Sequence, residues 1–270
     1  MSIPDQISKY RILGEMGRGL IGTYLQARDE RLGRDVTLKV LRPEEADDRE
    51  RTARFQREAQ ILGMLMHESI ASVLDFDLAE GGPYMAIEAL KGKRLSEVGR
   101  DGLGLGELLL VTARVLEGLA HAHQHGVVNR NVNPTTVWVT ADGAPKIFDF
   151  SVARVTSGSM LGTGKIVGTP DYMSPEQVKG LKVDGRSDIF SVGCMLYEML
   201  TSRRPFHDDN VMAVFYKVTH EEPDYDRIPV HPGIQHIVPI LEKALEKSLA
   251  SRYQTAVAMA GDIRRLLPAI

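Results

Sequence analysis

Residues 129–154 read NRNVNPTTVWVTADGAPKIFDFSVAR, and the rest of the chain is best interpreted outward from this stretch. Its second half is an apolar strand that runs into Asp149 and then turns. Its first half is a polar loop with Arg130 and Pro134, followed by a short apolar strand at residues 137–139. This order has the pattern of a catalytic loop, so we expect the functional site here.

The composition bounds the class of protein. The chain has 270 residues, of which 43% are hydrophobic and 26% are charged, which predicts a soluble globular chain in one domain or two lobes. A formal net charge of −3 gives no indication of a nucleic-acid partner. No apolar run reaches the ~18 residues of a membrane span, and one cysteine, Cys194, makes no disulfide framework. We expect a cytoplasmic location, with tethering through segments outside this chain left open.

A glycine-rich pattern follows the first strand-like residues. Gly17, Gly19 and Gly22 form G-x-G-x-x-G, a spacing that lets a hairpin bring backbone N–H groups close to phosphates. A dinucleotide-binding turn would need a helix directly after these glycines. The chain continues instead with the strand-like TYLQAR, so the pattern favours a hairpin between two strands.

A lysine in a strand and a glutamate in a helix are expected to pair. Residues 35–41 read DVTLKVL and alternate as a strand that embeds Lys39. In the next segment apolar residues recur at helical spacing, and Glu58 lies beside their stripe. A cation between apolar residues needs a partner. We therefore expect Glu58 to face inward and contact Lys39.

The second half of the chain predicts helices. Residues 189–200 are apolar almost all round, which is typical of a buried central helix. A long helix is expected over residues 107–125, with Gly126 as its C-cap. Further helices are expected near residues 211–220, 234–249 and 255–267.

These motifs, in this order and spacing, resemble the serine/threonine protein kinases, most closely the bacterial kinases of eukaryotic type. Residues 129–136 resemble H-R-D-x-K-P-x-N, residues 149–151 resemble D-F-G, and residues 174–176 resemble A-P-E. The resemblance implies an α+β, bilobal protein-kinase-like fold with a small β-rich N-lobe and a larger α-helical C-lobe. It implies an N-terminal extension at residues 1–9, an N-lobe at 10–89 and a C-lobe at 90–268.

The resemblance also implies roles for individual residues. Lys39, aimed by Glu58, would contact the α/β-phosphates of ATP, and Asp149 would bind Mg²⁺ or Mn²⁺. If the pocket is open, the nucleotide-binding set is Gly17, Gly19, Gly22, Lys39, Glu58, Glu88 and Leu90, of which the last two belong to the hinge. The implied structural residues are Arg130, Glu176, Asp188 and Arg252, and the candidate phosphosites are Thr163 and Thr169.

The catalytic loop departs from the family pattern at several positions. Asn131 stands at the position of the catalytic Asp, and loss of a general base costs about 10²–10⁴ in rate. Asn133 replaces the loop Lys, and by analogy with oxyanion donors a lost charge contact costs roughly 10²–10³. Thr136 replaces the metal-binding Asn. Asn129 replaces the His that packs beneath the D-F-G Phe, so Phe150 is expected to be less firmly held.

The adenine pocket is expected to be blocked or reshaped. Tyr24 replaces a Val that packs on the base, and Thr37 replaces the Ala of V-A-I-K. Trp138 stands at the residue that forms the floor of the pocket. Tyr and Trp each bury about 150–250 Å², which is comparable to the surface of a purine.

We therefore interpret the chain as a pseudokinase, a regulatory or scaffolding module that binds a protein partner. That partner would be a module that reads phosphothreonine, or another kinase. Two alternatives stay open: a nucleotide-binding switch without turnover, and a weak or atypical serine/threonine kinase that uses ATP with Mg²⁺ or Mn²⁺. The first interpretation predicts no phosphoryl transfer, the second measurable ligand affinity, and the third transfer that depends on Asp149.

Overall fold

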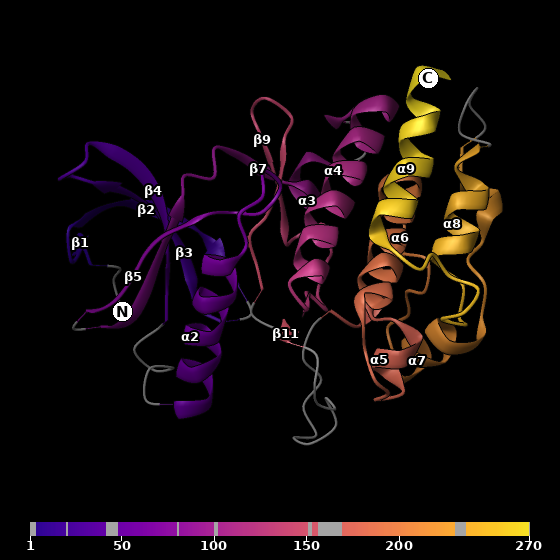
Figure 1. Ribbon diagram of the computed structural model, residues 1–270, viewed down its shortest axis with the longest axis horizontal. Helices are drawn as coiled ribbons and strands as arrows, with labels where there is room; N and C mark the ends of the chain where they lie inside the picture. Colours follow the sequence, from indigo (N-terminus) through magenta and orange to yellow (C-terminus); the bar gives the residue numbers. More distant parts are fainter. Residues whose placement is uncertain are drawn as a thin grey trace.

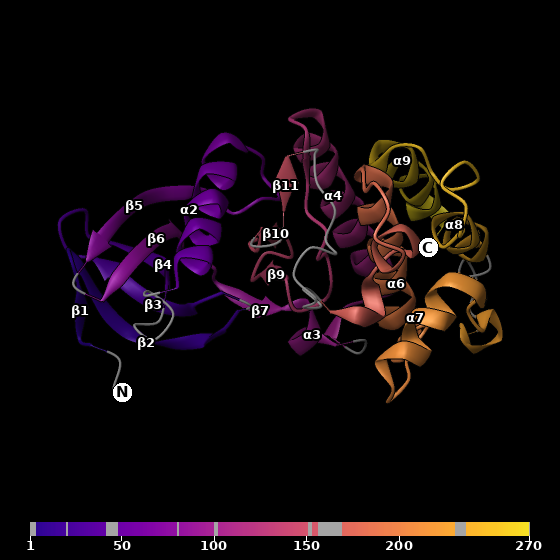
Figure 2. The ribbon, with the colours of Figure 1, turned by 90° about the horizontal axis from the view of Figure 1, so that it is seen from below.

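The chain folds into two lobes joined by a short connection. The computed structural model describes all residues except 1–3, 20, 42–47, 80, 100–101, 151–152, 156–168, 230–235 and 270. Both views show a sheet with one long helix at one end of the molecule and a bundle of helices at the other (Figures 1 and 2). Within the described residues, no helix is long and apolar enough to cross a membrane.

The smaller lobe is an antiparallel sheet of six strands in the order β1-β2-β3-β4-β6-β5. Successive side chains of each strand point to opposite faces of the sheet. Val36 and Leu38 of β4 therefore enter one buried cluster, while Lys39 faces the opposite side. Helix α2 (Arg49–Met64) is capped by the Asp48 side chain and packs on β5 and β6. The strands are β1 Gln6–Ile7, β2 Tyr10–Arg18, β3 Thr23–Asp29, β4 Arg34–Val40, β5 Val73–Ala79 and β6 Gly82–Glu88.

The larger lobe is built around helix α6 (Gly185–Thr201). Every side chain from Ser187 to Leu200 except Glu198 is buried, as the apolar sequence of this helix predicts. The surrounding helices are α3 Leu95–Val98, α4 Leu105–Gln124, α5 Pro175–Val178, α7 Val211–His220, α8 Val238–Ala244 and α9 Ala256–Leu266. Short 3₁₀ turns are η3 Pro170–Tyr172, η4 Tyr225–Arg227 and η6 Leu267–Ala269.

Two small sheets carry the segment between the lobes. Strand β9 (Val137–Thr140) pairs with β7 (Gly92–Arg94) on one side and with β10 (Pro145–Ile147) on the other. Strand β8 (Val127–Val128) pairs with β11 (Arg154–Val155). The loop between β8 and β9 and the residues after β10 therefore lie at the junction of the lobes (Figure 2).

One predicted helix is shorter than expected. Residues 234–249 were predicted to form a single helix, whereas the described helix α8 runs only over Val238–Ala244. Pro239 near its N-terminus is compatible with a helix start there. After Leu245 the chain turns, and this turn brings Arg252 back to the buried Glu176.

Candidate active site

A buried ion pair links β4 to α2. Nζ of Lys39 lies 2.7 Å and 2.6 Å from the two carboxylate oxygens of Glu58, and neither side chain is exposed. The same Glu58 carboxylate accepts a hydrogen bond of 3.2 Å from the backbone N–H of Phe150. Nζ of Lys39 is also 3.8 Å from Oδ1 of Asp149. The structure thus brings together the strand lysine, the helix glutamate and the carboxylate after β10.

The protonation of this group follows from its burial and its charges. Burial works against the charged form of Lys39, but the charges around it, first that of Glu58 and then those of Tyr24 and Asp149, together outweigh burial, so the pKa of Lys39 is raised. Burial raises the pKa of Glu58 to about 7, against the attraction of Lys39. Lys39 therefore remains an ammonium group.

Asp188 of helix α6 holds the loop between β8 and β9. The Asp188 carboxylate accepts hydrogen bonds from the backbone N–H groups of Asn129 and Arg130, at 2.9 Å and 2.7 Å. Nε2 of His123 lies 2.7 Å from the same carboxylate. Arg130 has φ of +68°, a strained conformation for a residue with a Cβ. Three groups around one buried carboxylate hold the loop in this conformation.

Asn129 connects the loop to the segment after β10. Its Nδ2 donates a hydrogen bond of 2.9 Å to the carbonyl of Asp149, and its Oδ1 accepts one of 3.0 Å from the N–H of Asn131. The sequence predicted that Asn129 would leave Phe150 less firmly held. In the structure the Asn129 amide supplies a direct link, and Phe150 is buried.

The substituted loop residues bond to one another. Nδ2 of Asn133 donates to the carbonyl of Asn131 at 2.9 Å, and its Oδ1 accepts from the N–H of Thr135 at 2.9 Å. Oγ1 of Thr136 donates to the Asn131 carbonyl at 3.0 Å and accepts from the N–H of Asn133 at 3.0 Å. Asn133 and Thr136 are both buried. Their polar atoms stabilise the loop, and neither side chain brings a positive charge to the cleft.

Thr169 faces the catalytic-loop position. Its backbone N–H lies 3.3 Å from Oδ1 of Asn131, and the residue lines the same cavity. The other candidate phosphosite, Thr163, lies outside the described residues.

The hinge contains a contact that the sequence did not predict. The backbone N–H of Leu90 donates a hydrogen bond of 3.1 Å to Oγ1 of Thr37, which also lies 3.8 Å from the sulfur of Met16. The carboxylate of Glu88 is occupied by Lys146 at 2.8 Å and by the N–H of Ser72 at 2.9 Å. A hydroxyl on the cleft side of β4, opposite the hinge, was the signal available in the sequence.

Three aromatic rings pack on the inner side of the cleft. The ring of Phe148 meets Tyr24 edge to face with centroids 5.1 Å apart, and Trp138 in the same way at 5.9 Å. Tyr24 and Phe148 are 2% exposed and Trp138 6%. Oη of Tyr24 and Nε1 of Trp138 have no hydrogen-bond partner among the described residues. The sequence predicted Tyr24 and Trp138 here but did not single out Phe148.

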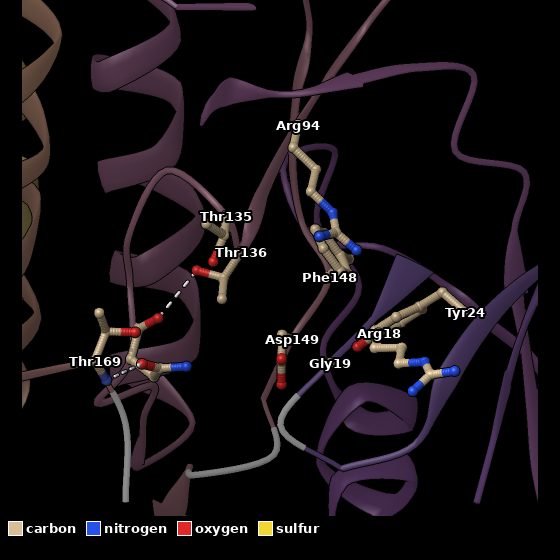
Figure 3. Close-up of a pocket in the computed structure, with 10 residues that line it drawn as sticks. Arg18, Gly19, Tyr24, Arg94, Thr135, Thr136, Phe148, Asp149 and Thr169 are labelled. Carbon is tan, nitrogen blue, oxygen red and sulfur yellow. Dashed lines mark hydrogen bonds between the residues drawn. The ribbon is translucent and has the colours of Figure 1, made fainter. Parts of the chain in front are cut away.

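A cavity of about 200 Å³ remains between the lobes and is partly open to solvent. Figure 3 shows side chains from the glycine hairpin, from β7 and from the catalytic loop around it. The described lining residues are Arg18, Gly19, Tyr24, Arg94, Asn131, Thr135, Thr136, Phe148, Asp149 and Thr169.

The glycines of the hairpin permit close approach. Gly17 has φ of +138°, and a Cβ on it would lie 2.7 Å from Nη2 of Arg94. Gly22 has φ of +82°, and a Cβ there would lie 2.4 Å from the carbonyl oxygen of Val40. A Cβ on Gly19 would lie 2.8 Å from the ring of Tyr24. The hairpin therefore lies directly on side chains of the cleft.

The remaining structural residues form a second buried pair. Nη1 of Arg252 lies 2.8 Å from Oε1 of Glu176, and Nη2 lies 3.2 Å from Oε2. Burial would raise the pKa of Glu176, but hydrogen bonds from Arg252 and Ser187, together with the charge of Arg252, outweigh burial and lower it. This pair ties α5 to the turn before α9.

Comparisons with known proteins agree with this arrangement. The family model described as protein kinase domain matches residues 10–260. The chain is similar to the serine/threonine-protein kinase PknB of Mycolicibacterium smegmatis, with 38% identity over 98% of this chain and 44% of the relative. It is also similar to a probable serine/threonine-protein kinase of Streptomyces coelicolor, with 38% identity over 96% of this chain and 40% of the relative. The chain thus spans less than half the length of these relatives.

Solved structures support the fold. One structure of the PknI kinase domain from Mycobacterium tuberculosis has a TM-score of 0.74 and 24% identity, and the match covers 97% of both chains. A second has a TM-score of 0.74 and 24% identity, over 98% of this chain and all of the other. The predicted bilobal kinase fold is confirmed. Loss of activity is not shown by these similarities, and the names of the relatives favour the weak-kinase alternative over the inactive interpretation.

Proposed function

The chain belongs to the protein kinase family, and from this premise we propose that it is a regulatory kinase domain that binds protein partners and transfers phosphate weakly at most. The observation that supports this proposal most strongly is that the catalytic loop lacks the acidic and basic side chains needed for transfer. Asn131 stands where a general base is required, and its amide does not accept a substrate proton at neutral pH. The polar atoms of Asn133 are bonded within the loop, and no charge from this side chain meets the transferring phosphoryl group.

The base side of the cleft supports the same proposal. In this family ATP is held at the hinge, yet the hinge N–H of Leu90 is bonded to Thr37. The rings of Tyr24, Phe148 and Trp138 fill the adjacent volume. The residues present therefore fit the phosphates of ATP and a divalent metal, through Lys39 and Asp149, but do not fit its adenine.

A second candidate is a weak serine/threonine kinase. It is favoured by the Lys39–Glu58 pair, by the position of Asp149 beside Lys39, and by relatives that are named as kinases. In this candidate a water or another group would accept the substrate proton in place of Asn131.

We propose the class of the partner from what the kinase family acts on. Kinases act on proteins, and we expect a protein that reads phosphothreonine, or another kinase, to bind the segment containing Thr163 and Thr169. A pull-down that is unchanged by alanine at both threonines would remove this partner class.

Phosphoryl transfer from γ-labelled ATP, with Mg²⁺ and with Mn²⁺, tests the proposal. We expect incorporation into a general protein substrate, and into the chain itself, at the level of an Asp149→Ala variant. Label transfer that is clearly above this variant would establish the weak kinase. Nucleotide binding without transfer, lost in Lys39→Ala, would instead indicate the nucleotide-binding switch.

A further inference from the structure

Three histidines meet where the loop between α2 and β5 lies against α4. The ring of His121 packs against those of His67 and His125, with centroids 5.4 Å and 4.5 Å away. His121 and His125 lie one helical turn apart at the C-terminal end of α4, whereas His67 belongs to the loop. Within the described residues, no group of three His, Cys, Asp or Glu side chains could hold a metal ion. We therefore consider how these rings bind protons.

The protonation of His67 is tied to the backbone of its loop. The backbone N–H of Ser69 donates a hydrogen bond of 3.0 Å to Nδ1 of His67, and the N–H of Ile70 donates one of 3.0 Å to the His67 carbonyl. Because a backbone N–H can only donate, Nδ1 carries no proton in this turn. Protonation of His67 at this atom removes the acceptor, and the N–H of the buried Ser69 then loses its partner.

A positive charge is also unfavourable on His121. Its Nε2 is shielded from water and has no hydrogen-bond partner among the described residues. Burial, and then the charges of His125 and His67, lower the pKa of His121 from its ordinary value of 6.5. The stability that the neutral ring provides is therefore fully present above pH 6.5, and it is lost as the pH falls through the lowered pKa.

The nearby carboxylates are engaged with another group. Glu117, one turn before His121 on α4, forms an ion pair of 2.6 Å with Arg264 of α9. The hydrogen bond to Glu117, against the effect of burial, and the charges of Glu117 and of Glu68 in the loop raise the pKa of Arg264. The charges that act on His121 are those of the two other histidines. A proton on His121 is therefore not compensated by an acidic side chain.

The loop that carries His67 also pairs with β10. The N–H of Ala71 donates a hydrogen bond of 2.9 Å to the carbonyl of Ile147, and the N–H of Ile147 donates one of 2.8 Å to the carbonyl of Ser69. Ile147 is the last residue of β10 and precedes Asp149 by two positions. Movement of the loop away from α4 would therefore reach the strand that leads to Asp149.

We propose that His67, His121 and His125 form a pH-sensitive contact, which holds the loop after α2 against α4 while the rings are neutral and releases it when they gain protons. Histidine is the side chain whose charge ordinarily changes between about pH 8 and 5. Two effects act in the same direction: a protonated His67 loses the N–H of Ser69, and positive charges repel one another across the packed rings. The contact lies at the junction of the lobes, so its response to pH does not depend on whether the chain transfers phosphate.

Hydrogen–deuterium exchange of single amides, read by NMR at about pH 7.5 and about pH 5.5 and corrected for the intrinsic pH dependence of exchange, tests the contact. We expect the protection of the amides of Ser69, Ala71 and Ile147 to fall by about 10-fold at the lower pH, which corresponds to the loss of roughly one hydrogen bond. The amides of the buried helix α6 should keep their protection.

Matched variants assign the effect to the histidines. In His67→Asn the side-chain oxygen can still accept from the N–H two residues on, but it gains no proton; in His121→Phe the ring remains without a charge. We expect the combined variant to be equally protected at both pH values, and His220→Asn, at the exposed end of α7, to behave as the unsubstituted chain.

His67→Asn alone should already reduce the fall in protection, and it provides the test if the combined variant does not fold. The proposed contact is contradicted by protection that is the same at both pH values in the unsubstituted chain. It is equally contradicted by a fall that persists undiminished in the His67 variants, or by a fall of the same size in α6.

Discussion

At the scale of single residues, two buried ion pairs have different consequences. Lys39 and Glu58 lie in the cleft, where they position an ammonium group. Arg252 and Glu176 lie inside the larger lobe, where Arg252 also donates to the carbonyl of Arg186 at 2.9 Å. The second pair therefore joins α5, α6 and the turn before α9, and its loss is a question of stability.

Replacing Arg252 by methionine should destabilise the chain by about 3–5 kcal/mol at pH 7, because the buried Glu176 carboxylate loses its partner. The pKa of Glu176 is lowered from its ordinary value of 4.5 in the folded state. The contribution of the pair is therefore fully present above pH 4.5 and is lost as the pH falls through the lowered pKa. Urea unfolding at several pH values measures the difference in unfolding free energy between the Arg252→Met variant and the unsubstituted chain. This difference should become smaller in acid. The exposed Arg265→Met is the control, and equal unfolding free energies for Arg252→Met and the unsubstituted chain would contradict the expectation.

At the scale of elements, the periodicity of the sequence predicted which side chains point toward the cleft. The inward direction of Lys39 follows from the period of β4, and that of Glu58 from the stripe on α2. The hydrogen bond from Leu90 to Thr37 could not be predicted in this way, because it depends on how closely β4 approaches the hinge. The position of Arg94 likewise depends on the glycine hairpin that lies on it.

Opening the base side of the cleft should restore nucleotide binding. In a Tyr24→Val, Thr37→Ala, Trp138→Met variant, the hinge N–H of Leu90 is released and two large rings are removed. We expect adenosine and ATP to stabilise this variant by about 2.7 kcal/mol at 100 times the dissociation constant, a shift of roughly 5 °C or more. The unsubstituted chain should not respond to adenosine. A triple variant that folds cooperatively but shows no adenosine response would show that other groups close the cleft.

At the scale of the whole molecule, the departure from the family has a base side and a transfer side. Tyr24 and Thr37 of the smaller lobe and Trp138 of the larger lobe lie on the base side. The larger lobe alone brings Asn131 and Asn133 to the transfer side. Between them, Glu58, which pairs with Lys39 inside the smaller lobe, accepts a hydrogen bond from the N–H of Phe150 and so links the two lobes. Phosphoryl transfer needs both halves at once, so their repair should be strongly coupled.

Repairing one half alone should therefore not restore transfer. The loop variant Asn131→Asp, Asn133→Lys, Thr136→Asn regains a base, a charge and a metal ligand, but ATP still meets a closed base side. The Tyr24→Val, Thr37→Ala, Trp138→Met variant is expected to bind ATP but lacks the groups for transfer. We expect labelled phosphate transfer above the Asp149→Ala background only when both sets are combined, with a gain of at least about 10²-fold over either set. Transfer by the loop variant alone would mean that ATP already enters the unaltered cleft, and it would favour the weak kinase over the regulatory domain.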